Sequence, residues 1–227
     1  MKNTIIKPVA TIFNDFKEKF GIPRQSGRAP SVLSRIVFTP EFRDIDAVRG
    51  IEGFSHLWLI FDFSLSHRTS FTPLVRPPRL GGNQKIGVFA SRSPFRPNSL
   101  GLSSVKLLRV EQTKDGPTLI VSGADLLNGT PIFDIKPYIP FTDCHSDAIG
   151  GFADNECNHK LCVQFLNGSE NFVSKDKLTA LTECLADDPR PSYQDDGRIY
   201  GLAFADYNVK FKVESHTLFV LEVQPSN

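Results

Sequence analysis

The sequence is divided into short runs of β-branched and aromatic residues by frequent turn-forming residues. It contains 16 glycines and 16 prolines among 227 residues, and most of them fall between the runs. Since proline lacks a backbone donor and glycine readily adopts turn conformations, this spacing keeps strands short. We expect strands at Ile5–Phe13, Val32–Phe38, Phe54–Phe63, Ile86–Ala90, Ser103–Val110, Thr118–Ala124 and Pro131–Ile139. Many short strands with few helices predict a mainly β chain, built as a barrel or a sandwich.

Some runs give more detail. Phe54–Phe63, with the sequence FSHLWLIFDF, is almost entirely apolar, which is typical of a strand that is buried on both faces or lies inside a barrel. Ser103–Val110 and Thr118–Ala124 flank the turn sequence Lys114-Asp115-Gly116-Pro117, which predicts a hairpin. Glu41–Val48 places apolar residues at helical spacing and is followed by a glycine, so a short helix is expected there.

Near Phe141 the sequence changes from short apolar runs to a polar, irregular segment, and this predicts two domains, residues 1–142 and 143–227. The second part opens with a polar, irregular segment. We then expect a strand at Lys160–Leu166, a helix capped by Ser174 that ends at Ala186, and a hairpin of Ile199–Val213 with Leu218–Val223. The second part is therefore predicted to be a small α+β domain.

Cysteine usage and hydropathy indicate a cytoplasmic protein with free thiols. Cys144, Cys157, Cys162 and Cys184 are too few for a disulfide-dense secreted domain. No apolar run approaches the ~20 residues that span a bilayer, and the first apolar stretch is too short for a secretory signal, so we expect no membrane partner. The cysteines and their neighbouring histidines fit no common zinc spacing, and no metal site is expected.

A cationic segment occupies the middle of the chain. Residues Phe63–Val110 hold eight Lys and Arg and no Asp or Glu, although the net charge of the whole chain is only +1. Arg76, Arg79, Arg92 and Arg96 lie there among prolines and glycines. Guanidinium groups in stiff, irregular backbone suit the binding of phosphate or carboxylate. A solvated basic face is the alternative, because charge segregation alone fits both.

The nucleotide-binding signatures GxGxxG after a strand and GxxxxGK[ST] are absent from the sequence. The central motif GVFASRSPFRPNSLG, at Gly87–Gly101, instead resembles the TrmO (TsaA-like) family of tRNA methyltransferases. Further segments resemble the same family: KEKFGIPRQSG (Lys17–Gly27), DAVRGIEGFSHLWLIF (Asp46–Phe61), VRPPRLGGN (Val75–Asn83), NGTPIFDIKPYIPF (Asn128–Phe141) and DPRPSY (Asp188–Tyr193).

The resemblance implies an N-terminal β-barrel methyltransferase domain that works as a homodimer, with S-adenosylmethionine as methyl donor. It implies methylation of the N6 nitrogen of threonylcarbamoyladenosine, next to the anticodon, so the anticodon arm of tRNA is the expected partner. Two departures from the family pattern lie near the expected donor site. Phe13-Asn14-Asp15 stands where family members often have Arg-Ser-Pro, and Ser26 replaces a proline.

The resemblance also assigns residues to the donor site. These are Gln25, Ser26, Gly27, Ser64, Leu65, Arg92, Leu100, Asn128, Gly129, Thr130 and Pro131. Glycine-containing turns can offer backbone donors and acceptors to adenine and ribose. Arg92 is a candidate for the methionyl carboxylate, because that group needs a cation.

Asp134, Lys136 and Tyr138 are the candidate catalytic residues. Asp134 and Lys136 are two residues apart on a strand and so share one face. They are either part of a cross-strand ion pair at a barrel rim, or a base and a hydrogen-bond donor for the carbamoyl-substituted nitrogen.

Arg68, Arg76, Arg79 and Arg96 are the candidates for contacts with RNA phosphates. For Arg96 the alternative is packing against the carbonyls of its own loop. Two rival functions stay open at this point: a β-barrel module that binds RNA or a ligand without catalysis, and a methyltransferase for another nucleoside or a small molecule.

Overall fold

A computed structural model describes residues 4–77, 80, 83–156, 160–190 and 197–226. The predicted mainly β class is confirmed. The first sheet contains β1 (Ala10–Phe13), β2 (Leu33–Phe38), β3 (His56–Asp62), β6 (Leu100–Thr113), β7 (Gly116–Ser122) and β8 (Pro131–Pro137).

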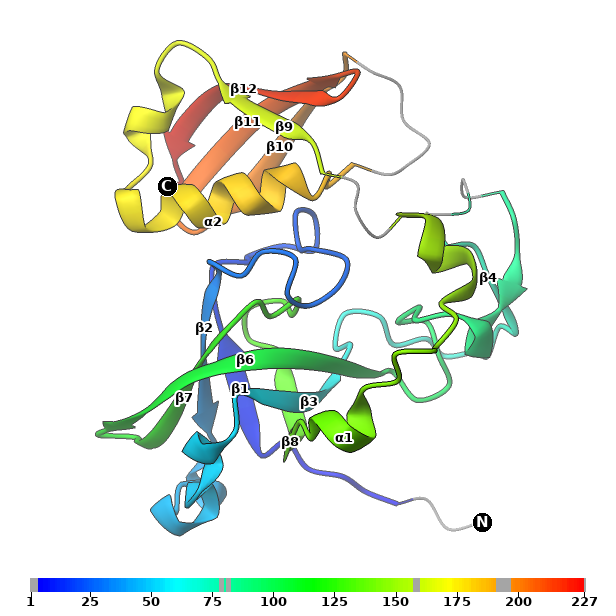
Figure 1. Cartoon of the computed structure of the whole chain (residues 1–227), viewed down its shortest axis with the longest axis vertical. Coiled ribbons are helices and arrows are strands. Elements are labelled where there is room, and N and C mark those ends of the chain that lie inside the picture. Colours follow the sequence, from blue (N-terminus) through cyan, green and yellow to red (C-terminus); the bar gives the residue numbers. More distant parts are fainter. Residues whose placement is uncertain (1–3, 78–79, 81–82, 157–159, 191–196, 227) are drawn as a thin grey trace.

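This first sheet closes on itself. The strand order is β1-β2-β7-β6-β3-β8, and β8 pairs back to β1 through Ala10 and Ile132. Every neighbouring pair is antiparallel, so one end of the barrel collects the last residues of β1, β3 and β7 and the first residues of β2, β6 and β8 (Figure 1). We call this end the upper rim.

The barrel core is built from alternate strand positions. In β3, Leu57, Leu59 and Phe61 are buried, whereas the residues between them are half-buried. Of the two alternatives expected for this strand, the structure has the strand of a barrel, because its second face, with Trp58 and Ile60, is the half-buried outer surface of the barrel. The predicted hairpin is confirmed as β6 and β7, which pair from Lys106 to Thr113.

Two local predictions are wrong. Glu41–Val48 is not an α-helix but two 3-10 turns, Pro40–Phe42 and Ile45–Val48, and a third follows at Ile51–Gly53. The side chain of Asp44 accepts a hydrogen bond from the Asp46 backbone N–H at 2.9 Å, an interaction that favours turns over a continuous helix.

The expected strand at Ile86–Ala90 shrinks to β5 (Ile86–Gly87). It pairs only with β4 (Leu74–Val75), and a 3-10 turn then takes Val88–Ala90. The chain leaves the ladder because β4 offers just two residues for pairing. Val88 is buried, whereas Phe89 is exposed.

The second sheet has the order β10-β11-β12-β9, with β9 parallel to β12. Its strands are β9 (Cys162–Phe165), β10 (Ile199–Phe204), β11 (Tyr207–Glu214) and β12 (Thr217–Pro225). Ile199–Val213 was expected as one strand, but a turn at Ala205, with φ of 49°, divides it into β10 and β11. The predicted helix is present as α2 (Lys175–Ala186), with Ser174 at its N-cap position.

The second core is not formed by the C-terminal residues alone. Phe16, Ala29 and Val32, from the segment between β1 and β2, are buried together with Leu181 and Phe211 of α2 and β11. The β1–β2 segment therefore packs between the barrel and the second sheet (Figure 1).

Between these parts, α1 (Pro140–Asp143) and a 3-10 segment (Gly151–Glu156) lead from β8 to β9, and another 3-10 turn (Ser169–Phe172) leads to α2. None of the helices in the described ranges is long and apolar enough to cross a membrane. Cys144, Cys162 and Cys184 are free thiols; Cys157 lies outside the described residues.

Candidate functional site

Segments that the family resemblance assigned to the donor site lie together at the upper rim. Ser64 and Leu65 follow β3, Leu100 begins β6, and Pro131 begins β8. Leu100 lies opposite Asp62 in the β3–β6 ladder, and the Phe63 N–H donates to the Ser99 carbonyl at 2.8 Å. Leu65 and Leu100 keep apolar surface exposed, with 64% and 38% of each residue accessible. Segments far apart in the sequence thus share one end of one sheet.

Two glycines bring the Gln25–Gly27 loop onto this rim. The Gly27 N–H donates to the Gly123 carbonyl at 2.7 Å, and the Gly123 N–H donates to the Val32 carbonyl at 3.1 Å. Both glycines have positive φ, and a Cβ at Gly123 would lie 3.1 Å from the Gly27 Cα. Glycine is needed here because the two backbones touch directly.

Arg92 joins the cationic segment to the same loop. Its Nη1 donates to Gln25 Oε1 at 2.6 Å, and the side chain is exposed. The guanidinium therefore lies beside the Gln25–Gly27 loop with hydrogen-bonding capacity toward solvent, as a group that receives a carboxylate would.

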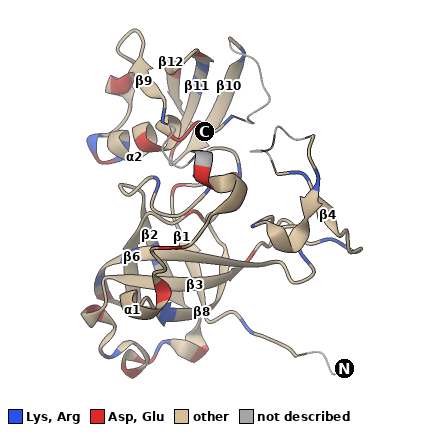
Figure 2. Cartoon of the chain, turned by 45° about the vertical axis from the view of Figure 1, so that its right-hand side comes forward, with Lys and Arg blue, Asp and Glu red and all other residues tan. Residues whose placement is uncertain are grey.

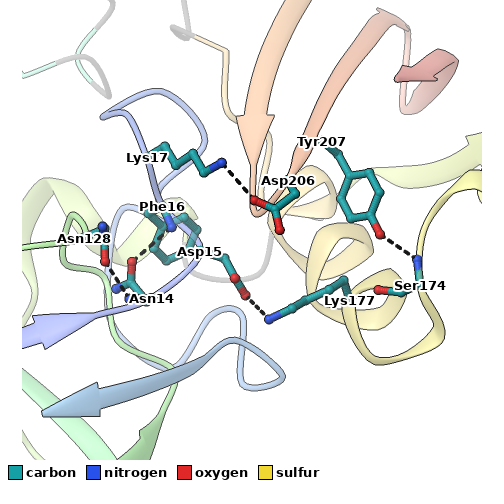
Figure 3. A network of polar contacts seen from close by, with 9 residues as sticks. All are labelled: Asn14, Asp15, Phe16, Lys17, Asn128, Ser174, Lys177, Asp206 and Tyr207. Carbon is teal, nitrogen blue, oxygen red and sulfur yellow. Dashed lines mark hydrogen bonds and ion pairs between the residues drawn. The ribbon is translucent and has the colours of Figure 1, made fainter. Parts of the chain in front are cut away.

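The turn at Asn128–Pro131 is fixed by hydrogen bonds to β1 and to the residues that follow β1. Its backbone N–H groups at Asn128 and Gly129 donate to Phe16 and Ile12 at 2.9 and 2.8 Å. The Asn128 side-chain oxygen accepts from the Asn14 N–H at 3.0 Å, as Figure 3 shows. Because the Asn128 side-chain oxygen already has a partner, Asn128 first serves to position the turn.

Asp125 lies at the centre of these segments and was missed by sequence reasoning. Burial raises the pKa of its carboxyl group, while hydrogen bonds from Ser103 and from the Ser26 backbone, and the charge of Arg92, act in the opposite direction. Its Oδ1 atom is buried with no hydrogen-bond partner in the described part of the chain. In the sequence, the only indication is that Asp125 is an acidic residue between two apolar residues, Ala124 and Leu126, which are buried in the structure.

The predicted RNA-binding arginines have different surroundings. Arg96 Nη1 donates to the Ser91 carbonyl at 2.9 Å, so this side chain packs against its own loop, as the alternative reading foresaw. The Arg68 guanidinium lies 3.9 Å from the centre of the exposed Phe95 ring. Arg76 is exposed just after β4, on the excursion with Lys and Arg that Figure 2 shows beside the barrel. Arg79 lies outside the described residues.

The three catalytic candidates lie on the outer face of the barrel. Lys136 Nζ is 2.9 Å from Asp134 Oδ2, and both side chains are about half exposed. The two residues form an ion pair, but it lies within β8 and is not the cross-strand pair at a rim that was the expected alternative. Lys136 lies opposite Trp58, whose side chain also faces outward. At a rise of about 3.3 Å per residue, Lys136 is roughly 16 Å along β8 from Pro131. A single chain therefore does not bring Lys136 or Tyr138 to the upper rim.

Tyr138 belongs to an aromatic group near the lower end of the barrel. Its ring lies 5.4 Å from that of Trp58 and 6.3 Å from that of His56. Desolvation and the nearby Cys144 and Asp143 raise the pKa of its phenol. The pKa of Asp143 is lowered, because the Ile139 N–H and the Trp58 indole both donate to its carboxylate. The hydrogen bond from Trp58 of β3 to Asp143 of α1 connects these two elements.

Two family models match the chain. The TrmO N-terminal domain (tRNA-methyltransferase O) matches residues 11–144, and the TrmO C-terminal domain matches residues 158–226. The chain belongs to the TrmO family.

Relatives and solved structures agree with this membership. A tRNA (adenine(37)-N6)-methyltransferase of Escherichia coli K12 is 38% identical over 99% of this chain and all of that protein. A protein of Pseudomonas aeruginosa named "Putative S-adenosylmethionine-dependent methyltransferase RcsF" is 39% identical over 90% of both chains. A crystal structure of TrmO from Pseudomonas aeruginosa superposes with a TM-score of 0.81 at 32% identity, covering 100% of this chain and 99% of that one.

The departure at Asn14-Asp15 from the TrmO pattern has a clear structural role. Asn14 Nδ2 donates to the Leu126 carbonyl at 2.8 Å, and Asp15 forms an ion pair with Lys177 of α2 at 2.7 Å (Figure 3). The Ala205 N–H also donates to the Asp15 carbonyl at 2.9 Å. These two residues therefore connect the Asn128 turn on one side to the second sheet and its helix on the other.

Two hollows flank this connection, and neither contains a predicted donor-site residue. One, of about 260 Å³, lies between Lys19–Arg24 and Asp187–Arg190. The other, of about 400 Å³, lies between Asn14–Lys17 and the start of α2. Across the described ranges, no cluster of His, Cys, Asp and Glu has the arrangement of a metal site; Cys157 and His159 lie outside them.

Proposed function

We propose that this chain transfers a methyl group from S-adenosylmethionine to the N6 nitrogen of adenosine 37 in tRNA. The observation that carries the proposal is the convergence of four separate segments on the upper rim, in a chain that belongs to the TrmO family. Gln25–Gly27, Ser64–Leu65, Arg92 with Leu100, and Asn128–Pro131 surround one rim with glycine turns, apolar surface and a cation. This combination suits a nucleoside joined to a charged amino acid.

Within this site the roles follow from chemistry. Glycine turns at Gly27 and Gly129 present backbone to adenine and ribose, and the exposed Leu65 and Leu100 offer apolar contact. Arg92 receives the methionyl carboxylate. The donor's sulfonium supplies the electrophile, so the protein's main contribution is to hold the methyl group in line with the acceptor nitrogen.

The acceptor is threonylcarbamoyladenosine rather than plain adenosine. Its N6 lone pair is delocalised into the carbamoyl group, so attack benefits from a base or from a donor to the carbamoyl oxygen. Asp134, Lys136 and Tyr138 supply these groups. The separation of Lys136 and Tyr138 from the upper rim within one chain means that these two act only if another copy brings its β8 face to that rim.

The enzyme therefore works as a homodimer. Apolar side chains on the outer surface of the barrel support this, since Leu102 is 57% exposed opposite Ile60, and Phe141 of α1 is 91% exposed. Exposed apolar side chains grouped on one face are typical of protein interfaces.

The domain boundaries, residues 1–142 and 143–227, lie close to the limits of the two TrmO domain matches.

tRNA approaches along the cationic excursion between β3 and β6. Arg68 and Arg76 contact phosphates of the anticodon arm, Arg79 belongs to the same segment, and Arg96 shapes the loop that carries Arg92. A tRNA substrate places the enzyme in the cytoplasm.

The test is methylation in vitro with labelled S-adenosylmethionine. Two tRNA pools are compared, one bearing threonylcarbamoyladenosine and one lacking it, and nucleosides are analysed by mass spectrometry. Methyl incorporation at N6 of the modified nucleoside in the first pool alone is expected. Donor binding without turnover would identify a binding module, and a methylated product elsewhere would identify another nucleoside as substrate.

A further inference from the structure

Asp125 is a half-buried residue among the donor-site segments, and it is not one of the residues that the family resemblance assigned to the donor site. It follows β7 by three residues, directly beneath the loop that the Gly27–Gly123 hydrogen bond fixes to the rim. Three elements act on its carboxyl group: the Ser26 backbone in that loop and the Ser103 side chain in β6 by hydrogen bonds, and Arg92 by its charge. Its residue surface remains partly accessible, although Oδ1 itself is covered.

An orphaned carboxylate oxygen in such a place needs an explanation. A buried oxygen without a partner forfeits hydrogen-bond energy, and a buried charge costs more. Arg92 offsets part of this through its charge, but its guanidinium donates to Gln25. A ligand that brings a positive charge and hydrogen-bond donors to the partly accessible side of Asp125 would offset the remaining cost.

We propose that Asp125 binds the α-ammonium group of S-adenosylmethionine while Arg92 binds its α-carboxylate, so that the pair recognises the amino-acid end of the methyl donor. A zwitterion is matched by a cation and an anion at one site, and Arg92, beside the Gln25–Gly27 loop, is the charged group that acts on the Asp125 carboxyl. The inference rests on the proposed donor site and adds to it the recognition of the amino acid.

The sulfonium is a poorer partner for Asp125. Its positive charge diminishes as the methyl group leaves, so a carboxylate beside it would stabilise the ground state more than the transition state. The ammonium keeps its charge throughout, and a hydrogen bond to it contributes affinity without opposing the chemistry. Asp125 is thus a donor-binding residue rather than a base.

Calorimetry on the full chain tests the pair with three ligands. S-adenosylhomocysteine has both charged groups, its deaminated analogue keeps only the carboxylate, and 5′-methylthioadenosine has neither. Asp125→Asn should weaken S-adenosylhomocysteine binding by about tenfold or more, as loss of a charge-assisted hydrogen bond predicts, and leave the other two ligands unchanged. Arg92→Gln should weaken S-adenosylhomocysteine and the deaminated analogue, but not 5′-methylthioadenosine.

Asp115→Asn is the matched control, because Asp115 lies in the β6–β7 turn at the opposite end of the barrel. An equal loss for all three ligands in Asp125→Asn would overturn the inference, since Asp125 would then only shape the rim, and so would no loss at all. If the wild type bound none of the ligands, the donor site itself would be refuted together with the inference.

Should Asp125→Asn fail to fold, the wild type still provides a test. Protonation of Asp125 at acidic pH should weaken S-adenosylhomocysteine but not the deaminated analogue. Arg92 is the charged group that acts on Asp125, and Ser26 and Ser103 are its uncharged neighbours. Parallel pH profiles for the two ligands would refute the assignment.

Discussion

Phe61 and Gly101 face each other across β3 and β6, and each limits the size of the other. A Cβ at Gly101 would overlap the Phe61 ring, which is buried in the barrel core. We expect Gly101→Ala to lower the free energy of unfolding by about 1–3 kcal/mol, because a packed core resists added volume. Denaturant unfolding measures this change.

The control for that substitution is Gly201→Ala. Gly201 lies in β10 with open space around its Cα, so alanine there should be neutral or slightly stabilising. The double variant Gly101→Ala with Phe61→Leu should recover part of the loss. Strictly additive effects of the two substitutions would contradict the proposed overlap.

Asp125 makes stability depend on pH in a definite direction. Burial raises its pKa above the ordinary value of 3.8, so the folded protein holds this proton more tightly than the unfolded chain does. The stabilising contribution of Asp125 is therefore present at low pH and is lost as the pH rises through its folded-state pKa. Relative to wild type, the stability of Asp125→Asn should increase as the pH is raised from the acidic range, where Asp125 is protonated, through the folded-state pKa of Asp125.

Thermal unfolding of both proteins across this pH range measures the effect. Asp115→Asn, at an exposed position, should show no such trend. A difference in melting temperature between Asp125→Asn and wild type that is independent of pH would show that Asp125 titrates as it does in the unfolded chain.

At the scale of elements, the β1–β2 segment holds α2 against the barrel. The Asp15–Lys177 pair is largely buried, with 17% and 32% of the two side chains exposed (Figure 3). Lys177→Met keeps the aliphatic stem but leaves Asp15 without this partner, and we expect it to lower the free energy of unfolding by about 1–2 kcal/mol. Lys210→Met is the matched control, since its pair with Glu222 is more exposed and contributes about 0–1 kcal/mol.

Denaturant titration compares these two lysine variants. Equal losses of stability in the two variants would show that the Asp15–Lys177 ion pair contributes no more to stability than an exposed ion pair does. A larger effect confined to Lys177→Met should also appear as faster hydrogen exchange in α2, because the helix would separate from the β1–β2 segment more often.

Elements were predictable from sequence where local pattern and pairing agree. The β6–β7 hairpin carries its own turn, and α2 begins after Ser174 as expected. Val88–Ala90 reads as a strand by composition, but its conformation depends on the short ladder that β4 offers. The length of that ladder depends on tertiary structure, so it cannot be predicted from the local sequence.

The site shows the same division between local and tertiary information. Motifs identified the rim segments, and the fold brought them together at the barrel end. Asp125 gave no periodic or spacing signal, since its significance comes from Ser26, Ser103 and Arg92, which are distant in sequence. Conversely, Lys136 lies next to the rim residues in sequence, yet an extended strand carries it away from them.

At the scale of the whole molecule, the residues proposed to bind the donor and those proposed to assist catalysis lie at separate places in one chain. The rim has the donor residues, and the outer face of β8 has Asp134 and Lys136. In a symmetric dimer, each rim can meet the β8 face of the other copy. Complementation between two inactive variants distinguishes this arrangement from a site within one chain.

Arg92→Gln damages the rim, and Lys136→Met damages the β8 face. In a dimer with shared sites, a mixed dimer has one site with both defects and one intact site. After unfolding and refolding of an equal mixture, half of the dimers are mixed, so methyl transfer to tRNA should return to about one quarter of the wild-type rate. Each variant refolded alone should stay inactive, and a mixture that also stays inactive would place both residues in the same site of one chain, contrary to the distance along β8.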